Sequence, residues 1–236
     1  MAKKSKIISG YNPQEVLALG VQTYNAQGFV RSGDGYIKVD PNTGEKSTEV
    51  KDNKSLILDL IADNTRPSPE DMQEAQVIMD KFSGKFMLKK LQGSLTRFET
   101  SVSEAFTNDL TNFTVAVIAS IPHMNVIDKV RQTITDKIEE LRFKSDYFGD
   151  IRTRYDISVE IIDVKFIQTS GVYMITSVYN NTDIIKFWWR DQPDISDIIN
   201  GKTVTIRGTV LKHENSKYSK AKETMLNRVK IMGELK

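Results

Sequence analysis

The stretch Gly201–Ile231, GKTVTIRGTVLKHENSKYSKAKETMLNRVKI, decides the fold of this chain. Every second residue from 204 to 210 is apolar or small, and the residues between them are polar. This period of two is typical of a strand with one buried face. A second alternation at 225–231 predicts a partner strand that projects Arg228 and Lys230 outward. The two strands are joined by a polar loop rich in lysine.

Three further strands are predicted upstream of this pair, at residues 155–164, 172–179 and 184–189. Turn-forming residues separate them, and residues 191–199 predict a short helix or turn before the fourth strand. Three strands, a short helical link and two strands follow one another in the order of a small Greek-key barrel. The last third of the chain is therefore predicted to be a β domain.

The first 150 residues predict a mainly helical region, because their apolar residues recur at helical spacing. Ser68-Pro69-Glu70-Asp71 is a typical helix start, with a serine cap, proline in the first turn and acidic residues after it. The predicted helical segments are 14–30, 55–61, 69–82, 96–106 and 125–143.

Other parts of this region are less regular. Turn residues at 31–53 predict a hairpin or an exposed loop. The run 113–121 fits either a helix or a strand, and Pro122 is expected to end it. Gly84 and Gly93 are expected to interrupt a further segment, 86–91. The period changes from 3.6 to 2 near residue 150, which predicts two domains, 1–150 and 151–236.

Composition limits what the protein does. The 236 residues carry a formal net charge of only +2, so affinity for nucleic acid requires local clustering of cations. The chain has no cysteine, which excludes disulfides and thiolate metal sites. No apolar run reaches the roughly 18 residues of a membrane span, and the N-terminus lacks the apolar core of a signal peptide. We therefore expect a cytoplasmic protein, in the host cytoplasm if the protein is viral, without membrane contact.

Residues 155–231 resemble an OB-fold domain. The resemblance is carried by Phe187-Trp188-Trp189, by the turn Asn200-Gly201-Lys202, and by Ile206-Arg207-Gly208-Thr209-Val210, whose glycine has the core-facing period. The tail at 213–230 is similar to the last hairpin of phage and replication-associated OB proteins. The resemblance implies an α+β protein in which a mainly helical N-terminal region precedes a five-stranded OB-type β-barrel. Residues 1–150 resemble no family that we can name.

Proteins of this family stack bases on aromatic side chains, at about 1–3 kcal/mol per base, and follow the phosphates with cations. Adjacent tryptophans face opposite sides of a strand, and alternation with Ile185 and Phe187 places Trp189 in the core and Trp188 outside. The stacking candidates implied by the resemblance are Tyr173, Tyr179, Trp188 and Tyr218.

The candidates for phosphate contact are basic residues of the same region. From Arg207 to Lys230 the chain has seven basic residues against two acidic ones, Glu214 and Glu223. This local excess favours nucleic-acid binding over a merely solvated face. The set is Lys186, Arg190, Arg207, Lys212, Lys217, Lys220, Lys222, Arg228 and Lys230.

No enzyme activity, cofactor or metal is predicted. Lys38-Val39-Asp40 resembles the start of the ligase motif Lys-x-Asp-Gly, but Pro41 replaces its glycine. Two histidines without cysteine do not supply a typical zinc site, and no phosphate-binding loop of the P-loop type occurs. Asp191, Asp194 and Asp197 fall in one turn, a spacing more typical of a solvated helix start than of a metal site.

The resemblance therefore implies a non-enzymatic protein that binds single-stranded DNA in replication, recombination or repair. Because the similar OB proteins include phage proteins, it also implies a phage origin. RNA fits the same chemistry, because stacking is indifferent to the sugar. The helical region is expected to supply self-association or contacts to other replication proteins. The alternative is a non-catalytic interaction or assembly factor whose barrel binds protein.

Overall fold

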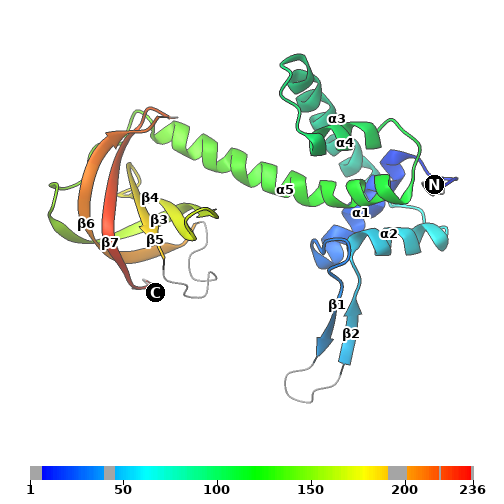
Figure 1. Cartoon of the computed structure of the whole chain (residues 1–236), viewed down its shortest axis with the longest axis horizontal. Helices are drawn as coiled ribbons and strands as arrows, with labels where there is room; N and C mark the ends of the chain where they lie inside the picture. The colour runs from blue at the N-terminus through cyan, green and yellow to red at the C-terminus, as the bar shows by residue number, and fades with distance from the viewer. Residues whose placement is uncertain (1–6, 40–45, 191–200, 218, 235–236) are drawn as a thin grey trace. The chain divides into compact units, whose positions relative to one another are not determined.

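The computed structural model describes residues 7–39, 46–190, 201–217 and 219–234. It confirms an α+β fold with helices first and a closed five-stranded sheet second (Figure 1). The helices are α1 (Pro13–Gln27), α2 (Asn53–Ala62), α3 (Pro69–Leu91), α4 (Arg97–Ala105) and α5 (Asn112–Leu141). The strands are β1 (Tyr36–Val39), β2 (Lys46–Val50), β3 (Arg154–Ile167), β4 (Val172–Tyr179), β5 (Asp183–Trp189), β6 (Thr203–Asn215) and β7 (Lys222–Glu234).

The chain divides into two compact units, Met1–Lys129 and Val130–Lys236. The division falls inside α5, about 20 residues before the position where the sequence changes period. The reason is that the end of α5 packs with the strands: Ile134, Ile138 and Leu141 lie against Ile162 and other apolar residues on the outside of the sheet. The last turns of this helix therefore belong to the β unit.

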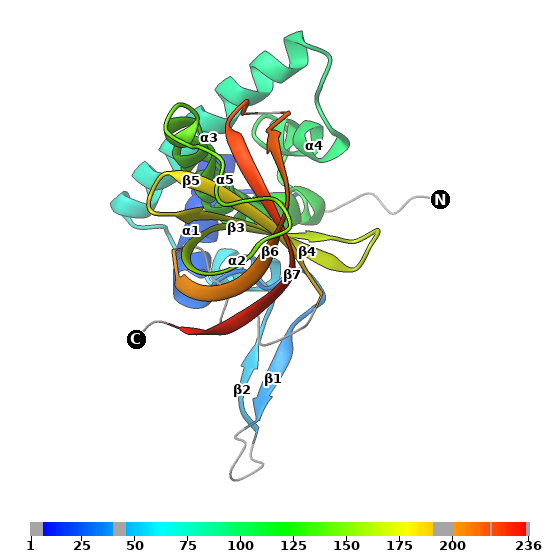
Figure 2. The same ribbon diagram turned by 90° about the vertical axis from the view of Figure 1, so that its left-hand side faces the viewer.

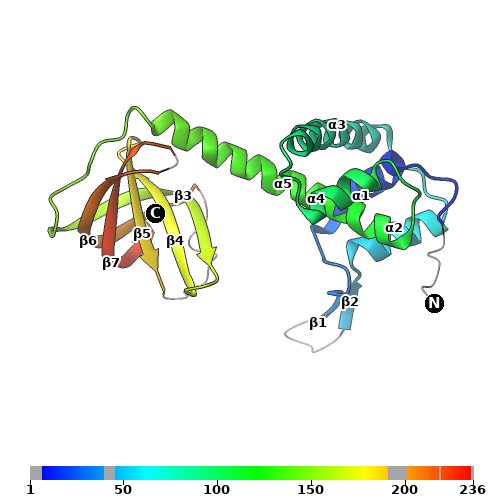
Figure 3. The same cartoon turned by 45° about the horizontal axis from the view of Figure 1, so that its top comes forward.

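The helical unit is built around α1, which lies against α2 and α3 (Figure 3). Residues 16–19 of α1 are completely buried, so this helix is apolar nearly all round. Its start is fixed by a capping box between Asn12 and Glu15, and α3 begins at the predicted cap Ser68. Within the segment 31–53, expected to be a hairpin or an exposed loop, β1 and β2 pair antiparallel.

Two predicted helix breaks are wrong. α3 continues through Gly84, because a mid-helix glycine costs only about 1 kcal/mol and Phe82 and Phe86 on either side are buried in the core. α5 continues through Pro122 and includes the ambiguous run 113–121 as helix. Pro122 packs against Gly20 of α1, where an added Cβ would lie 3.7 Å from the ring. Tertiary packing thus offsets the roughly 3 kcal/mol that proline costs inside a helix.

The five strands of the second unit close in a ring in the order β3-β4-β5-β7-β6. All neighbouring pairs are antiparallel except β5 and β7, which run parallel from Ile184 and Glu223 onward. The hairpin of β3 and β4 projects from this ring (Figure 2). All five strands predicted from alternation are confirmed, whereas the predicted turn at 191–199 lies outside the described residues.

The interior of the ring is filled by one face of every strand. Ile157, Ile175, Phe187, Ile206 and Leu226 each come from a different strand and are buried in one cluster. The side chains at the alternate positions of each strand face outward, as the alternation in the sequence predicts. Side chains on that outer surface are the ones available to a ligand.

The segment between α5 and β3 closes one end of the ring. The ring of Phe148 packs edge-on against Tyr155 and Tyr179, with centroid distances of 5.0 and 4.8 Å. Gly149 has a φ of 65°, and a Cβ there would lie 2.6 Å from the Tyr155 ring. Only glycine fits this position, because both the backbone conformation and the space exclude a side chain.

Gly208 allows β7 to bulge onto β6. The register between these strands shifts between Arg207 and Thr209, opposite Arg228, which has a left-handed φ of 50°. A Cβ on Gly208 would lie 3.1 Å from side-chain atoms of both Leu226 and Val229. The glycine therefore has a packing role as well as the core-facing period seen in the sequence.

We expect Gly208→Val to destabilise the β unit by about 1–3 kcal/mol, because its methyl groups overpack the core at the bulge. Thr209→Val is the matched control, since it places the same valine at an outward position of the same strand. Urea unfolding followed by tryptophan fluorescence, which reports the β unit alone, measures both changes. Equal stabilities of the two variants would contradict the packing role of Gly208.

Candidate nucleic-acid interface

The two tryptophans at the end of β5 have the opposite orientations predicted from the sequence. Trp189 is 8% exposed and packs in the barrel core, whereas Trp188 is 45% exposed on the outer surface. The strand alternates without a bulge from Ile184 to Trp189 in its pairing with β4, so the parity is preserved. Trp188 is therefore an indole presented to solvent by a rigid strand.

The register places Trp188 in a row with residues of two neighbouring strands. Trp188 pairs with Met174 of β4, which in turn pairs with Lys165 of β3. These three side chains share the outward parity and lie side by side on the sheet. We call Lys165, Met174, Lys186 and Trp188 the stacking face. Lys165 and Met174 were not predicted, because only the register between strands shows that they neighbour Trp188.

Not every cation near this face is available to a ligand. Lys186 makes a 2.8 Å ion pair with Glu223, and the Glu223 side chain is only 5% exposed. Its charge is therefore already balanced. Arg190 follows Trp188 by two residues and is exposed just beyond the end of β5.

The predicted tyrosines of β4 point toward the core. Tyr173 and Tyr179 are half-buried and pack with the interior cluster. Tyr179 is covered by the Phe148 ring, and Tyr173 lies 4.9 Å from Phe166 between ring centroids. The structure thus leaves Trp188 with a freer face than either tyrosine, and the predicted Tyr218 lies outside the described residues.

The end of β6, the start of β7 and the loop between them carry cations of two kinds. Lys212 pairs with Glu214, and Lys222 pairs with Asp146 at 2.9 Å while lying over the Tyr147 ring. The hydrogen bond from Lys222 lowers the pKa of the Asp146 carboxyl, which favours this pair. Lys217 and Lys220 are exposed, and neither makes an ion pair with any residue that the structure describes.

Arg207, Arg228 and Lys230 lie on another part of the ring. Arg207 pairs across the sheet with Lys230 on one side and with Asp156 on the other. It donates two hydrogen bonds of 2.6 Å to the Asp156 carboxylate. Arg154, which was not predicted from the sequence, lines an open depression together with Tyr155, Asp156, Arg207 and Lys230. We call Arg154, Asp156, Arg207, Arg228 and Lys230 the arginine face.

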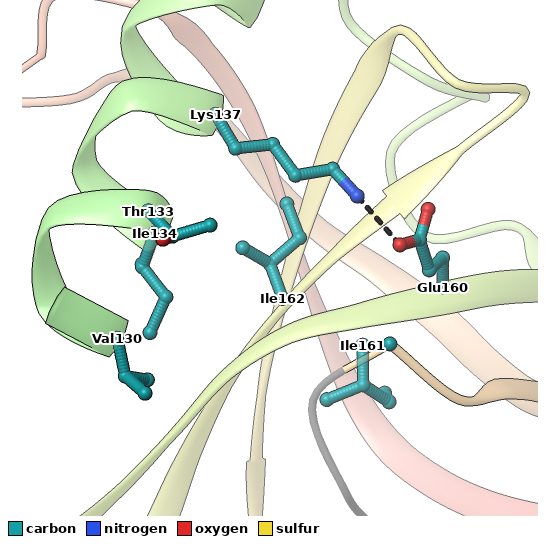
Figure 4. Close-up of a pocket in the computed structure, with 8 residues that line it drawn as sticks. Val130, Thr133, Ile134, Lys137, Glu160, Ile161 and Ile162 are labelled. Carbon is teal, nitrogen blue, oxygen red and sulfur yellow. Dashed lines mark hydrogen bonds and ion pairs between the residues drawn. The ribbon is translucent and has the colours of Figure 1, made fainter. Parts of the chain in front are cut away.

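The end of α5 lies between these two faces along β3. Figure 4 shows a hollow lined by Val130, Ile134 and Ile162, with Lys137 reaching Glu160 at its edge. The Lys137–Glu160 ion pair is 2.5 Å long. Glu160 lies between Asp156 and Lys165 on β3, so the helix and this pair interrupt the outer surface between the arginine face and the stacking face.

A separate groove occurs within the helical unit. It is lined by apolar residues of α4 and α5, and Phe98 and Phe113 remain exposed at its edge. Arg31 and Lys54 are the charged residues of its lining. This groove is the clearest feature of the helical unit that is compatible with the expected protein contacts.

In the described ranges, no group of three or more histidine or acidic side chains is placed to hold a metal ion. No helix in those ranges has the length and apolar character needed to cross a membrane. The aspartates at 191, 194 and 197 fall outside those residues.

No protein-family model matches the chain, and no curated protein or solved structure matches it significantly. The functional assignment therefore rests on the residues and geometry of the chain itself.

We expect collisional quenching by acrylamide to distinguish the two tryptophans. Trp189→Phe leaves Trp188 as the emitter, and its Stern–Volmer constant should be several-fold larger than that of Trp188→Phe, because Trp188 is 45% and Trp189 8% exposed. Far-UV circular dichroism controls for folding of both variants. Equal constants in folded variants would contradict the orientation of β5.

Proposed function

We propose that this protein binds single-stranded nucleic acid, with single-stranded DNA as the physiological ligand, through the outer surface of an OB-type barrel. The strand order supports the OB assignment, since the first strand neighbours the second and fourth and the third runs parallel to the fifth. OB-folds bind oligonucleotides on the face of their second and third strands and with the loops that flank it. Here those strands are β4 and β5.

The observation that carries the proposal is the exposed indole of Trp188 on the third strand of the ring. A base stacks on a flat ring that is fixed in place, and the ordered strand means that little conformational freedom is lost on binding. Met174 supports one side of this platform and Lys165 supplies a cation beside it. Arg190 and the loop residues Lys217 and Lys220 provide further charge for the phosphates.

Such a protein has no reaction to perform. It would hold single strands in an unpaired state during replication, recombination or repair, with the helical unit and its groove contacting partner proteins. Base-independent stacking and phosphate contact imply little sequence preference.

A protein ligand is the second candidate, and one observation favours it. Trp188 and Met174 form an apolar patch, and one of the lysines beside it, Lys186, is already neutralised by Glu223. Exposed tryptophan beside methionine is also typical of protein interfaces. Titration with oligo-dT at increasing salt concentration separates the two candidates, because binding to a nucleic acid weakens steeply as salt rises.

Trp188→Ala should weaken binding of oligo-dT by about 5- to 150-fold, which corresponds to the roughly 1–3 kcal/mol of one stacked base. Tyr36→Ala is the matched control, since Tyr36 is a similarly exposed aromatic residue on the β1–β2 hairpin. Anisotropy of a labelled oligonucleotide measures the affinity, with duplex DNA and oligo-U as comparisons. Equal affinity of the wild type and Trp188→Ala would refute the stacking platform.

Lys217→Gln combined with Lys220→Gln should reduce the slope of log K against log salt by about 1.4, from roughly 0.7 for each lost phosphate contact on a single strand. Both residues are exposed, so the barrel should remain folded. Lys212→Gln is the control, because Lys212 is already paired with Glu214. An unchanged slope would remove the β6–β7 loop from the binding path.

A further inference from the structure

The arginine face places like charges next to one another on three strands. Arg207 and Lys230 are direct cross-strand neighbours, and such pairs of like charge destabilise a sheet. Arg154 is on the same outward parity of β3 as Asp156, two residues away. The face contains four cations and one carboxylate, that of Asp156, which leaves an excess of three positive charges.

Asp156 is held in its charged form and committed to Arg207. The hydrogen bonds from Arg207 lower the pKa of the Asp156 carboxyl, and Arg154 lowers it further by its charge. The same pair raises the pKa of the Arg207 guanidinium. Asp156 thus fixes Arg207 in the sheet, while Arg154, Arg228 and Lys230 have no ion-pair partner among the described residues.

One cation of the arginine face, Arg228, has an unusual backbone conformation. Arg228 lies at the bulge of β7 with a left-handed φ of 50°, a conformation that costs a non-glycine residue about 1 kcal/mol. Bulges often redirect a side chain at a functional surface. The arginine face contains no exposed aromatic ring, since Tyr155 packs with the core and Phe148.

We propose that the arginine face is a second contact for the same nucleic-acid strand, which holds phosphates without stacking bases. This inference rests on the proposed function and adds to it a division of labour between two surfaces of one barrel. The outward positions 156 and 165 are about 30 Å apart along β3, at roughly 3.3 Å per residue. A short oligonucleotide therefore occupies the stacking face alone, whereas a long one reaches both.

The test compares oligo-dT of about 5 and about 30 nucleotides, one near the lower limit of the roughly 4–16 nucleotides that one OB-fold covers and the other well beyond it. Binding is read from the anisotropy of a labelled oligonucleotide, so it does not depend on Trp188 emission. Arg154→Gln combined with Lys230→Gln should lower the salt slope for the long strand by about 1.4 and leave the short strand unchanged. Arg207 is kept, because its removal would leave Asp156 unpaired.

Asp156→Asn should have the opposite effect and tighten binding of the long strand, because it removes the single carboxylate of the face. Arg131→Gln and Asp136→Asn, both at exposed positions of α5, control for the change in net charge. The inference is overturned if Arg154→Gln with Lys230→Gln leaves the long strand unchanged, or changes both lengths equally.

Failure of the proposed function gives a different result. In that case neither length binds to the wild-type protein, so the anisotropy of the labelled oligonucleotide does not rise with either one. If the stacking platform is correct and the arginine face is not, Trp188→Ala weakens both lengths and the arginine-face variants weaken neither.

Discussion

Closure of the ring by β7 is the constraint on which the rest of the β unit depends. This strand pairs antiparallel with β6 along most of its length and parallel with β5 over Ile184–Phe187. Closure gives every strand of the ring a hydrogen-bonded neighbour on both sides, so no strand of the ring is an edge strand. Gly208 allows this closure, because the bulge of β7 packs Leu226 and Val229 into the space that a side chain at position 208 would occupy.

The segment before β3 secures this closure from outside. The Ser145 hydroxyl donates to the Lys222 carbonyl and accepts from the Ile184 amide, and so joins β5 and β7 where their parallel pairing begins. Phe148 then closes the end of the ring, with its amide bound to Thr224. These contacts explain why the end of α5 belongs to the β unit rather than to the helices.

The outer surface of the ring divides by chemistry. Strands β4 and β5 present an indole with an apolar neighbour, and the arginine face on β3, β6 and β7 presents cations without an exposed aromatic ring. The end of α5 and the Lys137–Glu160 pair lie between them. A single strand of nucleic acid is a flexible polyanion with unpaired bases. Its bases can stack on the indole and its phosphates can bind the arginines, whereas the bases of a duplex are already stacked and paired. We therefore propose a single strand rather than a duplex.

The sequence by itself determined which residues form strands, their order and their parity. Alternation is a local property, so the opposite orientations of Trp188 and Trp189 could be read from four neighbouring residues. The core-facing position of Gly208 was readable for the same reason. The breaks expected at Gly84 and Pro122 were wrong, because the burial of Phe82, Phe86 and Pro122 against distant segments outweighs a local cost.

The tertiary structure alone decided which cations are free. Arg207, Lys222 and Lys186 are equivalent to Lys217 in a sequence, yet each is paired with a carboxylate that lies 37 to 76 positions away along the chain. It also brought Arg154 and Lys165 to the two faces. The physical reason is that an ion pair needs two charges within about 4 Å, and strand register and ring closure, not sequence proximity, set that distance.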